Sequence, residues 1–189
     1  MTIANSFLNF IVRFLFESYL YILLMRFIFQ RLGLRWSNQI IQFIIKATDP
    51  LVKPLRRFIP GFKGFDMSIL LWVLIVGFVE LTILLSLNTG FFPGILPVLF
   101  VSIIQSLVKV IYIYMIAIIL SALMSWFPRL QGGEIAELVQ EVADPCLGLV
   151  RRYVPSLGGI DFSPIVVFFV FYIIKDVLLM QLLYLIARL

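Results

Sequence analysis

The sequence predicts an all-α membrane protein with four transmembrane helices, arranged as two parallel tandem repeats of two spans. Each repeat is expected to carry amphipathic cytoplasmic helices between its spans. Two observations carry this prediction. Of the 189 residues, 62% are apolar and 13% are charged, whereas about 25% of the residues of a typical soluble domain are charged. A motif in the first half of the chain also returns 95 residues later, as tandem duplications do.

The repeated motif needs no gap in its alignment. Between residues 49–68 and 144–163, 8 of 20 positions are identical, where about one identity is expected by chance. The shared residues are Asp49, Pro50, Arg56, Arg57, Pro60, Gly64, Asp66 and Ser68, and Asp144, Pro145, Arg151, Arg152, Pro155, Gly159, Asp161 and Ser163. We therefore divide the chain into repeat 1 (residues 1–94) and repeat 2 (residues 95–189), and expect function to reside in the repeat itself.

Each repeat contributes two predicted spans, because about 20 apolar residues suffice to cross the hydrocarbon core. Repeat 1 has spans at about 13–32 and 67–87, and repeat 2 has them at about 108–127 and 164–186. The apolar stretch 91–127 is too long for one ordinary span. Pro93 and Pro97 therefore predict an outer loop and a lead-in before the third span.

Topology follows from the number of crossings and from the basic residues. Two crossings per repeat return the chain to its starting side, so the repeats are parallel. The first inter-span loop carries seven Lys and Arg residues and the third carries three, whereas the segment before Arg13 and the short middle loop carry none. Both motif loops should face the cytoplasm, with both termini outside.

The motif loops have patterns of their own. Ile40, Ile41, Ile44 and Ile45 in repeat 1, and Ile135, Leu138, Val139 and Val142 in repeat 2, recur at helical spacing. They predict a helix on the membrane surface in each loop. An Asp directly before Pro is typical of a helix N-terminus, so Asp49 and Asp144 predict a second short helix in each loop. Asp66 or Ser68, and Asp161 or Ser163, should cap the returning span, after a tight turn at Gly64 or Gly159.

Charges inside spans are candidate functional groups, because they are costly in a bilayer. The candidate intramembrane polar cluster consists of Arg13, Glu17, Glu80, Lys109, Lys175 and Asp176. Glu80 and Lys175 are one repeat apart, so they could pair across the pseudo-two-fold axis. A polar pathway for a cation and a structural pair that fixes helix register both fit, and the equal numbers of acids and bases favour the structural pair.

Several function classes are disfavoured by composition. The chain has no His and one Cys, which excludes disulfides within the chain, Cys/His metal sites and His-based catalytic triads. No cofactor and no catalysis are expected. Nucleic acid is not an expected partner, because the basic loops are short and lack an interleaved aromatic surface that could stack bases. The Arg-Arg pairs are expected to contact anionic lipid headgroups, or to dock a membrane-protein partner or a second copy of the chain.

A duplicated membrane protein whose loops carry Asp-Pro, Arg-Arg, Ile/Val-Pro and Gly-x-Asp-x-Ser resembles the YggT family, also called YlmG. The second copy, with Gly158 and Pro164, is closer to the usual pattern than the first, which has Lys63 and Ile69 there. The resemblance implies a multi-pass protein of the bacterial inner membrane, with relatives linked to osmotic stress and potassium uptake. Plastid relatives are linked to cytochrome complex assembly and nucleoid distribution. The resemblance assigns no catalytic residue.

Two functions are therefore open from the sequence. The first is a non-enzymatic organising or assembly factor that presents its loops to membrane partners. The alternative is a component of osmotic-stress response or of potassium or other ion transport, acting through the region of Glu80 and Lys175. Four spans are few for enclosing a pore, so a transporter should be an oligomer.

Overall fold

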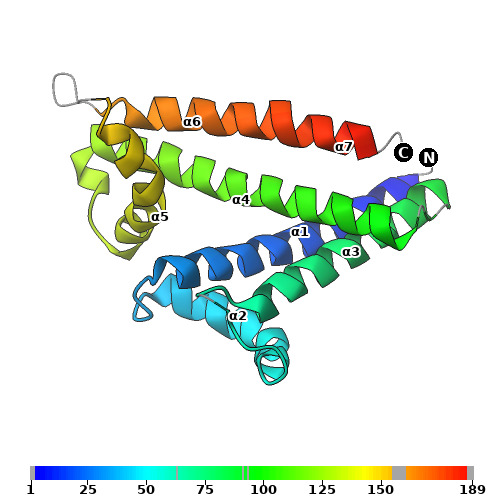
Figure 1. Ribbon diagram of the computed structural model, residues 1–189. Helices are drawn as coiled ribbons and strands as arrows, with labels where there is room; N and C mark the ends of the chain where they lie inside the picture. The colour runs from blue at the N-terminus through cyan, green and yellow to red at the C-terminus, as the bar shows by residue number, and fades with distance from the viewer. Residues whose placement is uncertain (1–2, 63, 91, 93, 155–160, 187–189) are drawn as a thin grey trace.

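The computed structural model describes residues 3–62, 64–90, 92, 94–154 and 161–186 (Figure 1). Its main helices are α1 (Ile3–Leu32), α2 (Gln39–Arg56), α3 (Met67–Thr89), α4 (Ile95–Trp126), α5 (Glu134–Arg151), α6 (Ser163–Ile173) and α7 (Met180–Ile186). A 3-10 turn, η1 (Pro128–Leu130), precedes α5, and a π-helical stretch, η2 (Ile174–Leu179), joins α6 to α7.

The described residues include four helices that are long and apolar enough to cross a membrane. They are Asn5–Leu32, Met67–Thr89, Ile95–Trp126 and Ser163–Tyr184. Many of their outward side chains are large and apolar, among them Phe10 and Phe14 on α1 and Phe169 on α6. Apolar surface of this extent needs a lipid or protein neighbour, so the prediction of four membrane-spanning helices is confirmed in length and composition.

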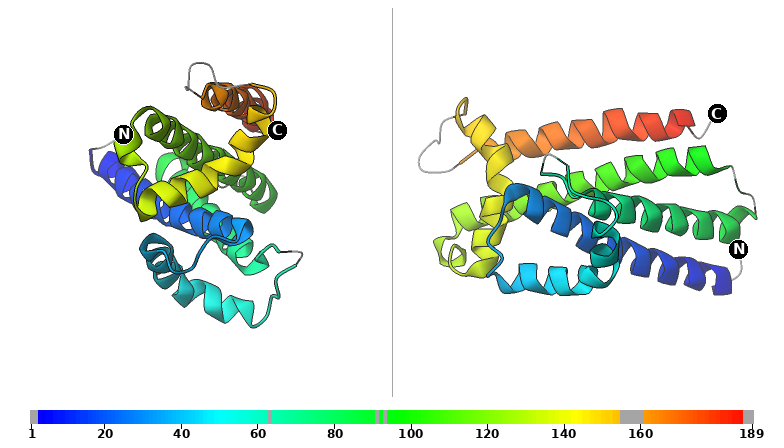
Figure 2. Two further views of the ribbon diagram at one scale, coloured as in Figure 1. Left: turned by 90° about the vertical axis from the view of Figure 1, so that its left-hand side faces the viewer. Right: turned by 60° about the horizontal axis from the view of Figure 1, so that its bottom comes forward.

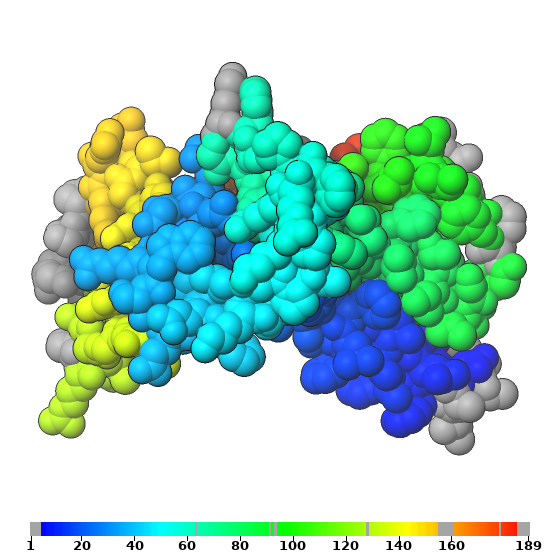
Figure 3. Space-filling model, turned by 90° about the horizontal axis from the view of Figure 1, so that it is seen from below, coloured from blue at the N-terminus to red at the C-terminus, as the bar shows by residue number. Residues whose placement is uncertain are grey.

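Each long helix packs against at least one other long helix. α1 packs on α3, α3 on α4, and α4 on α6. Both chain ends lie at one end of the molecule and α5 lies at the other, in two different views (Figures 1 and 2). Seen from below, α2 lies across the middle of the molecule in front of the long helices (Figure 3). An even number of crossings therefore agrees with the placement of the termini.

Two long helices begin earlier than predicted. α1 begins by Ile3 instead of near residue 13, and α4 is unbroken from Ile95 to Trp126 instead of beginning near residue 108. The expected separation of a lead-in from a third span at about 108–127 is wrong, because α4 is one continuous helix. Pro97 occupies the third position of α4, where a backbone N–H has no partner within the helix, so the missing N–H costs little. Pro93 lies outside the described residues.

The loop helices are also longer than predicted. α2 and α5 are single helices of 18 residues each, with Asp49-Pro50 and Asp144-Pro145 inside them. The prediction that Asp49 and Asp144 cap a second helix is wrong. In α2, the residues at positions 41, 44, 48 and 52 are all buried, so one continuous stripe runs past the proline. Burial of that stripe on both sides of Pro50 offsets the cost of the two internal prolines, Pro50 and Pro54, about 3 kcal/mol each.

The apolar faces of the loop helices point into the protein. Ile41 and Ile44 of α2 pack in one core cluster with Ile28 of α1, and Leu138 and Val142 of α5 belong to the same cluster. The expectation that these faces rest on the membrane is wrong for those four residues. Other protein helices cover the stripe that a lipid surface was expected to cover.

Candidate functional site

The motif forms the same ion pair in both repeats. Arg56 Nε donates to Asp66 Oδ2 at 2.7 Å, and Arg151 Nε donates to Asp161 Oδ2 at 2.8 Å. Each pair joins the last turn of a loop helix to the start of the returning span. The structure therefore brings together motif residues that are ten positions apart in the sequence.

The other carboxylate oxygen of each acid serves the returning span. Asp66 Oδ1 accepts from the amides of Ser68 and Ile69 at 3.1 and 3.3 Å, so Asp66 is the N-cap of α3. Asp161 Oδ1 accepts from the amide of Ser163 at 2.9 Å. Capping by Asp66 is therefore observed as predicted. Gly64 adopts a left-handed φ of 81° in the turn before Asp66, whereas Pro155 and Gly159 lie outside the described residues.

The hydrogen-bond partners of Asp161 stabilise its charged form. Burial disfavours the charged form, but hydrogen bonds from Arg151 and from Ser163 outweigh it and lower the pKa of the Asp161 carboxyl. The Arg151 guanidinium is also partly desolvated, yet its bonds to Asp161 and Asp144 raise its pKa. The pair is therefore fully charged at neutral pH.

Asp49 binds a cation that the sequence analysis did not identify. Arg26 of α1 is 3% exposed, and its Nη2 donates to Asp49 Oδ1 at 2.9 Å. Lys53 Nζ lies 2.7 Å from the other oxygen. Burial opposes ionisation of Asp49, but the bonds from Lys53 and Arg26 outweigh it and lower the pKa of the carboxyl. A signal did exist, because a cation near the end of an apolar run needs an acidic partner within reach.

The two arginines of each Arg-Arg pair have different surroundings in the fold. All four arginines are exposed, but the first Arg of each pair binds an Asp of the motif, whereas Arg57 and Arg152 form no ion pair with another described residue. Beside them, Phe58 is 81% exposed and Tyr153 is 85% exposed. Phe58 and Tyr153 are one repeat apart, so each repeat presents the same exposed pair of an arginine and an aromatic residue.

The two loop helices meet at their first turns. The amide of Gln39 donates to Glu134 Oε2 at 2.9 Å, and Asn38 Nδ2 donates to the Glu134 carbonyl at 3.0 Å. Glu134 thus supplies an acceptor to the N-terminus of α2, where free amides favour a carboxylate. Gln39 and Glu134 are themselves one repeat apart, and contact between equivalent positions is expected only close to a symmetry axis.

The six candidate intramembrane charges fall into two groups. Glu80 is 2% exposed and Lys109 is 8% exposed, and Lys109, Glu17 and Arg13 are the charged side chains within electrostatic range of Glu80. Lys175 Nζ instead lies 2.9 Å from Asp176 Oδ1, and donates to the Tyr112 hydroxyl at 3.4 Å.

Pairing of Glu80 with Lys175 across the axis is therefore not what the structure shows. α4 packs against both α3 and α6, and it lies between them in Figure 1. Lys175 consequently meets Tyr112 of α4 and its own neighbour Asp176, whereas Glu80 is buried on α3, which packs against α4.

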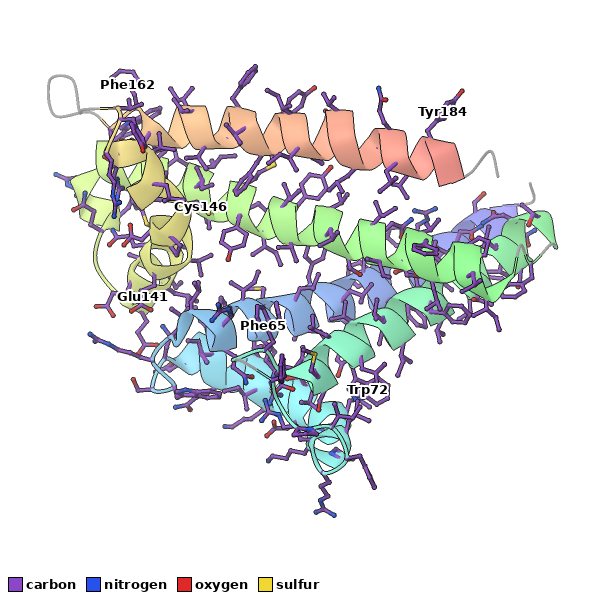
Figure 4. All side chains as sticks on the ribbon, viewed as in Figure 1. Phe65, Trp72, Glu141, Cys146, Phe162 and Tyr184 are labelled. Atoms are coloured by element: carbon purple, nitrogen blue, oxygen red, sulfur yellow. The ribbon has the colours of Figure 1, made fainter. Side chains whose placement is uncertain are left out.

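The one cysteine of the chain is not activated as a nucleophile. Burial raises the pKa of the Cys146 thiol, which lowers the thiolate fraction that a nucleophile requires. In the described ranges, no group of three or more acidic or cysteine side chains is placed to hold a metal ion. Cys146 lies on α5 facing the long helices, and Glu141 lies at the edge of α5 (Figure 4).

The family is decided by a comparison with known protein families. The CCB3/YggT family model matches the chain twice, at residues 5–87 and 100–182. This chain belongs to the CCB3/YggT family. The two matches are offset by the same 95 residues as the motif.

Relatives of this YggT-family chain extend over nearly its whole length. It is 36% identical to the uncharacterized protein PA0392 of Pseudomonas aeruginosa, over 87% of this chain and 84% of the relative. It is 34% identical to the uncharacterized protein YggT of Escherichia coli, over 89% and 87%. A match of 32% identity to YlmG homolog protein 2, chloroplastic, of Arabidopsis thaliana covers 35% of this chain and 26% of that protein. No solved structure matches the chain.

Proposed function

We propose that this YggT-family chain is a multi-pass protein of the bacterial inner membrane that organises membrane components and catalyses no reaction. The observation that carries the proposal is the exposed arginine and aromatic pair of each repeat, Arg57 with Phe58 and Arg152 with Tyr153. Two equivalent contact points on one protein suit the positioning of lipids or partners.

The chemistry of these pairs suits an anionic lipid surface. An arginine near the surface of an anionic leaflet contributes about 1 kcal/mol of attraction, and aromatic side chains favour the headgroup region. The neighbouring Arg56 and Arg151 are held by Asp66 and Asp161. They fix the loop, and leave Arg57 and Arg152 to face outward.

Two further observations support the parallel repeats and the topology in the proposal. The ion pair of the motif recurs at an offset of 95 residues, as the two family matches do. The basic residues concentrate in the motif loops, which favours cytoplasmic loops and outer termini.

The absence of catalysis in the proposal is supported by how the acids are used. Both oxygens of Asp66 and of Asp161 accept hydrogen bonds that hold the loop and the span. A general base needs a free lone pair directed at a substrate proton. The acids of the repeated motif therefore hold the structure of this chain together.

The double variant Arg57→Ala/Arg152→Ala is expected to retain less anionic phospholipid than the wild type, by about 30-fold in apparent affinity if each arginine contributes about 1 kcal/mol. Native mass spectrometry of the purified protein with phosphatidylglycerol measures this. Because both side chains are exposed, the thermal unfolding temperature should not change. The matched control, Arg35→Ala/Arg129→Ala, removes two other exposed loop arginines. Equal lipid retention in both double variants would contradict the proposed contact.

Transport is the alternative function, and the burial of Glu80 favours it. Glu80 Oε2 is buried without a hydrogen-bond partner, as a cation-binding carboxylate inside a membrane would be. Potassium flux into proteoliposomes separates the two functions. We expect no flux above that of empty vesicles, for wild type and for Glu80→Gln alike. Flux in the wild type that Glu80→Gln abolishes would establish transport and overturn the organising role.

A further inference from the structure

Arg26 fills a polar site between α1 and α2 in repeat 1. Its guanidinium donates to Asp49, to the Thr48 hydroxyl and to the Ile45 carbonyl. A planar group with five N–H donors suits such a set of acceptors. The site is therefore one in which repeat 1 supplies its own guanidinium.

Repeat 2 keeps the acceptor but lacks the cation equivalent to Arg26, although Arg151 Nη1 donates to Asp144 Oδ1 at 3.1 Å. The position equivalent to Arg26 is Ser121, whereas the position equivalent to Asp49 is Asp144. Because Ser is far smaller than Arg, the guanidinium and most of its methylene stem have no counterpart in repeat 2. Asp144 is accordingly 58% exposed, against 19% for Asp49.

A polar cavity occupies this place in repeat 2. It measures about 310 Å³, and its lining includes Ser121, Ser125, Gln140, Asp144, Arg151 and Asp161. It lies among α4, α5 and the start of α6, at the end of the molecule where Figure 4 labels Glu141, Cys146 and Phe162. This volume reaches the lower end of the range for ligand pockets, about 300 Å³.

The charges around the two sites have opposite signs. In repeat 1 the site and its rim carry four cations and two carboxylates: Arg26, Lys46, Lys53 and Arg56, with Asp49 and Asp66. The cavity lining in repeat 2 carries one cation and two carboxylates: Arg151, with Asp144 and Asp161; Ser121 and Gly148, at the positions equivalent to Arg26 and Lys53, are neutral. Arg151 already binds both Asp144 and Asp161, so the site retains an excess of negative charge.

We propose that the cavity of repeat 2 binds a guanidinium group, which takes the place that Arg26 fills in repeat 1. Asp144 accepts from the ligand as Asp49 accepts from Arg26, and the side-chain oxygens of Gln140 and Ser121 supply neutral acceptors. The guanidinium belongs either to a free small molecule or to an arginine side chain of another protein. The proposal does not rest on the organising function, because it concerns binding that a small cation alone can test.

The test is thermal unfolding of the purified full chain in detergent, with increasing methylguanidinium. We expect a saturable rise in the unfolding temperature, because a ligand that binds only the folded state stabilises it. Tetramethylammonium at equal concentration carries the same charge without N–H donors, and should give no saturable rise. Absence of a saturable effect specific to methylguanidinium in the wild type would overturn the proposal.

Two variants locate the binding. Ser121→Arg places a guanidinium in the cavity and should abolish the response to methylguanidinium. Asp144→Asn should weaken apparent affinity about tenfold or more, the loss expected for one hydrogen bond to a charged group. The matched control is Asp49→Asn, which alters the filled site of repeat 1 and should leave the affinity unchanged. If Ser121→Arg does not fold, Asp144→Asn decides, and an unchanged affinity in Asp144→Asn would overturn the proposal.

A peptide amide with one arginine distinguishes the two sources. Tighter binding of the peptide than of methylguanidinium supports the site and identifies an arginine side chain as its occupant. Binding of methylguanidinium that the peptide cannot match supports the site as one for a free guanidino compound.

Discussion

Replacing Arg26 with methionine is expected to lower the free energy of unfolding by about 2–4 kcal/mol. Arg26 is 3% exposed and donates to Asp49, Thr48 and Ile45. Methionine keeps most of the apolar stem but leaves those acceptors without their donor. Removal of one partner from a buried ion pair costs about 3–5 kcal/mol. The expected loss lies around and below the lower end of that range, because Asp49 is 19% exposed and keeps Lys53.

Lys53→Met is the matched control for Arg26→Met. Lys53 binds the same carboxylate at 2.7 Å, but its side chain is 70% exposed, so its loss should cost below about 1 kcal/mol. Chemical denaturation of each variant in detergent gives both values. Equal losses for the two variants would show that burial of the guanidinium does not stabilise repeat 1.

The parts of the fold that local patterns encode could be predicted from the sequence. The spans appear as long apolar runs, and α3 begins at Met67, as predicted. Capping by Asp66 could be predicted because an Asp two or three residues before free amides can bind them directly. The motif also indicates the family, and the family match shows it.

Helix lengths around the prolines could not be predicted by local rules. Asp-Pro favours a helix start, yet α2 and α5 continue through Pro50 and Pro145. In α2, tertiary packing decides the length of the helix. Val52 is fully buried beyond Pro50, in contact with the core formed by Leu23 and Ile69. A sequence window does not show which surface will cover such a stripe.

The partners of the charged residues were also beyond the sequence. Arg26, inside a predicted span, indicates that an acidic partner is needed, but its sequence context does not say that the partner is Asp49. The repeat offset correctly relates Glu80 to Lys175, but equivalence under a pseudo-two-fold axis does not imply contact. α4 packs between their helices, and Lys175 binds Asp176 instead.

Asp66→Ala is expected to lower the free energy of unfolding by about 2–3 kcal/mol. The variant removes the N-cap of α3, which contributes about 1 kcal/mol and up to about 2. It also leaves Arg56 without its carboxylate, although Arg56 keeps Gln30 as an acceptor. Because Asp66 is 6% exposed, water replaces the lost contacts poorly. Chemical denaturation in detergent measures the change.

Two further variants separate the cap from the ion pair. Asp66→Asn keeps an oxygen for the amides of Ser68 and Ile69 but removes the charge, so it should cost less than Asp66→Ala. Asp161→Ala should also cost less, because Asp161 is 19% exposed and Arg151 retains Asp144. If Asp66→Asn is as damaging as Asp66→Ala, the ion pair with Arg56 provides the stability and the cap provides little. If Asp161→Ala lowers the stability most of the three variants, the greater burial of Asp66 than of Asp161 does not determine how much each acid contributes to stability.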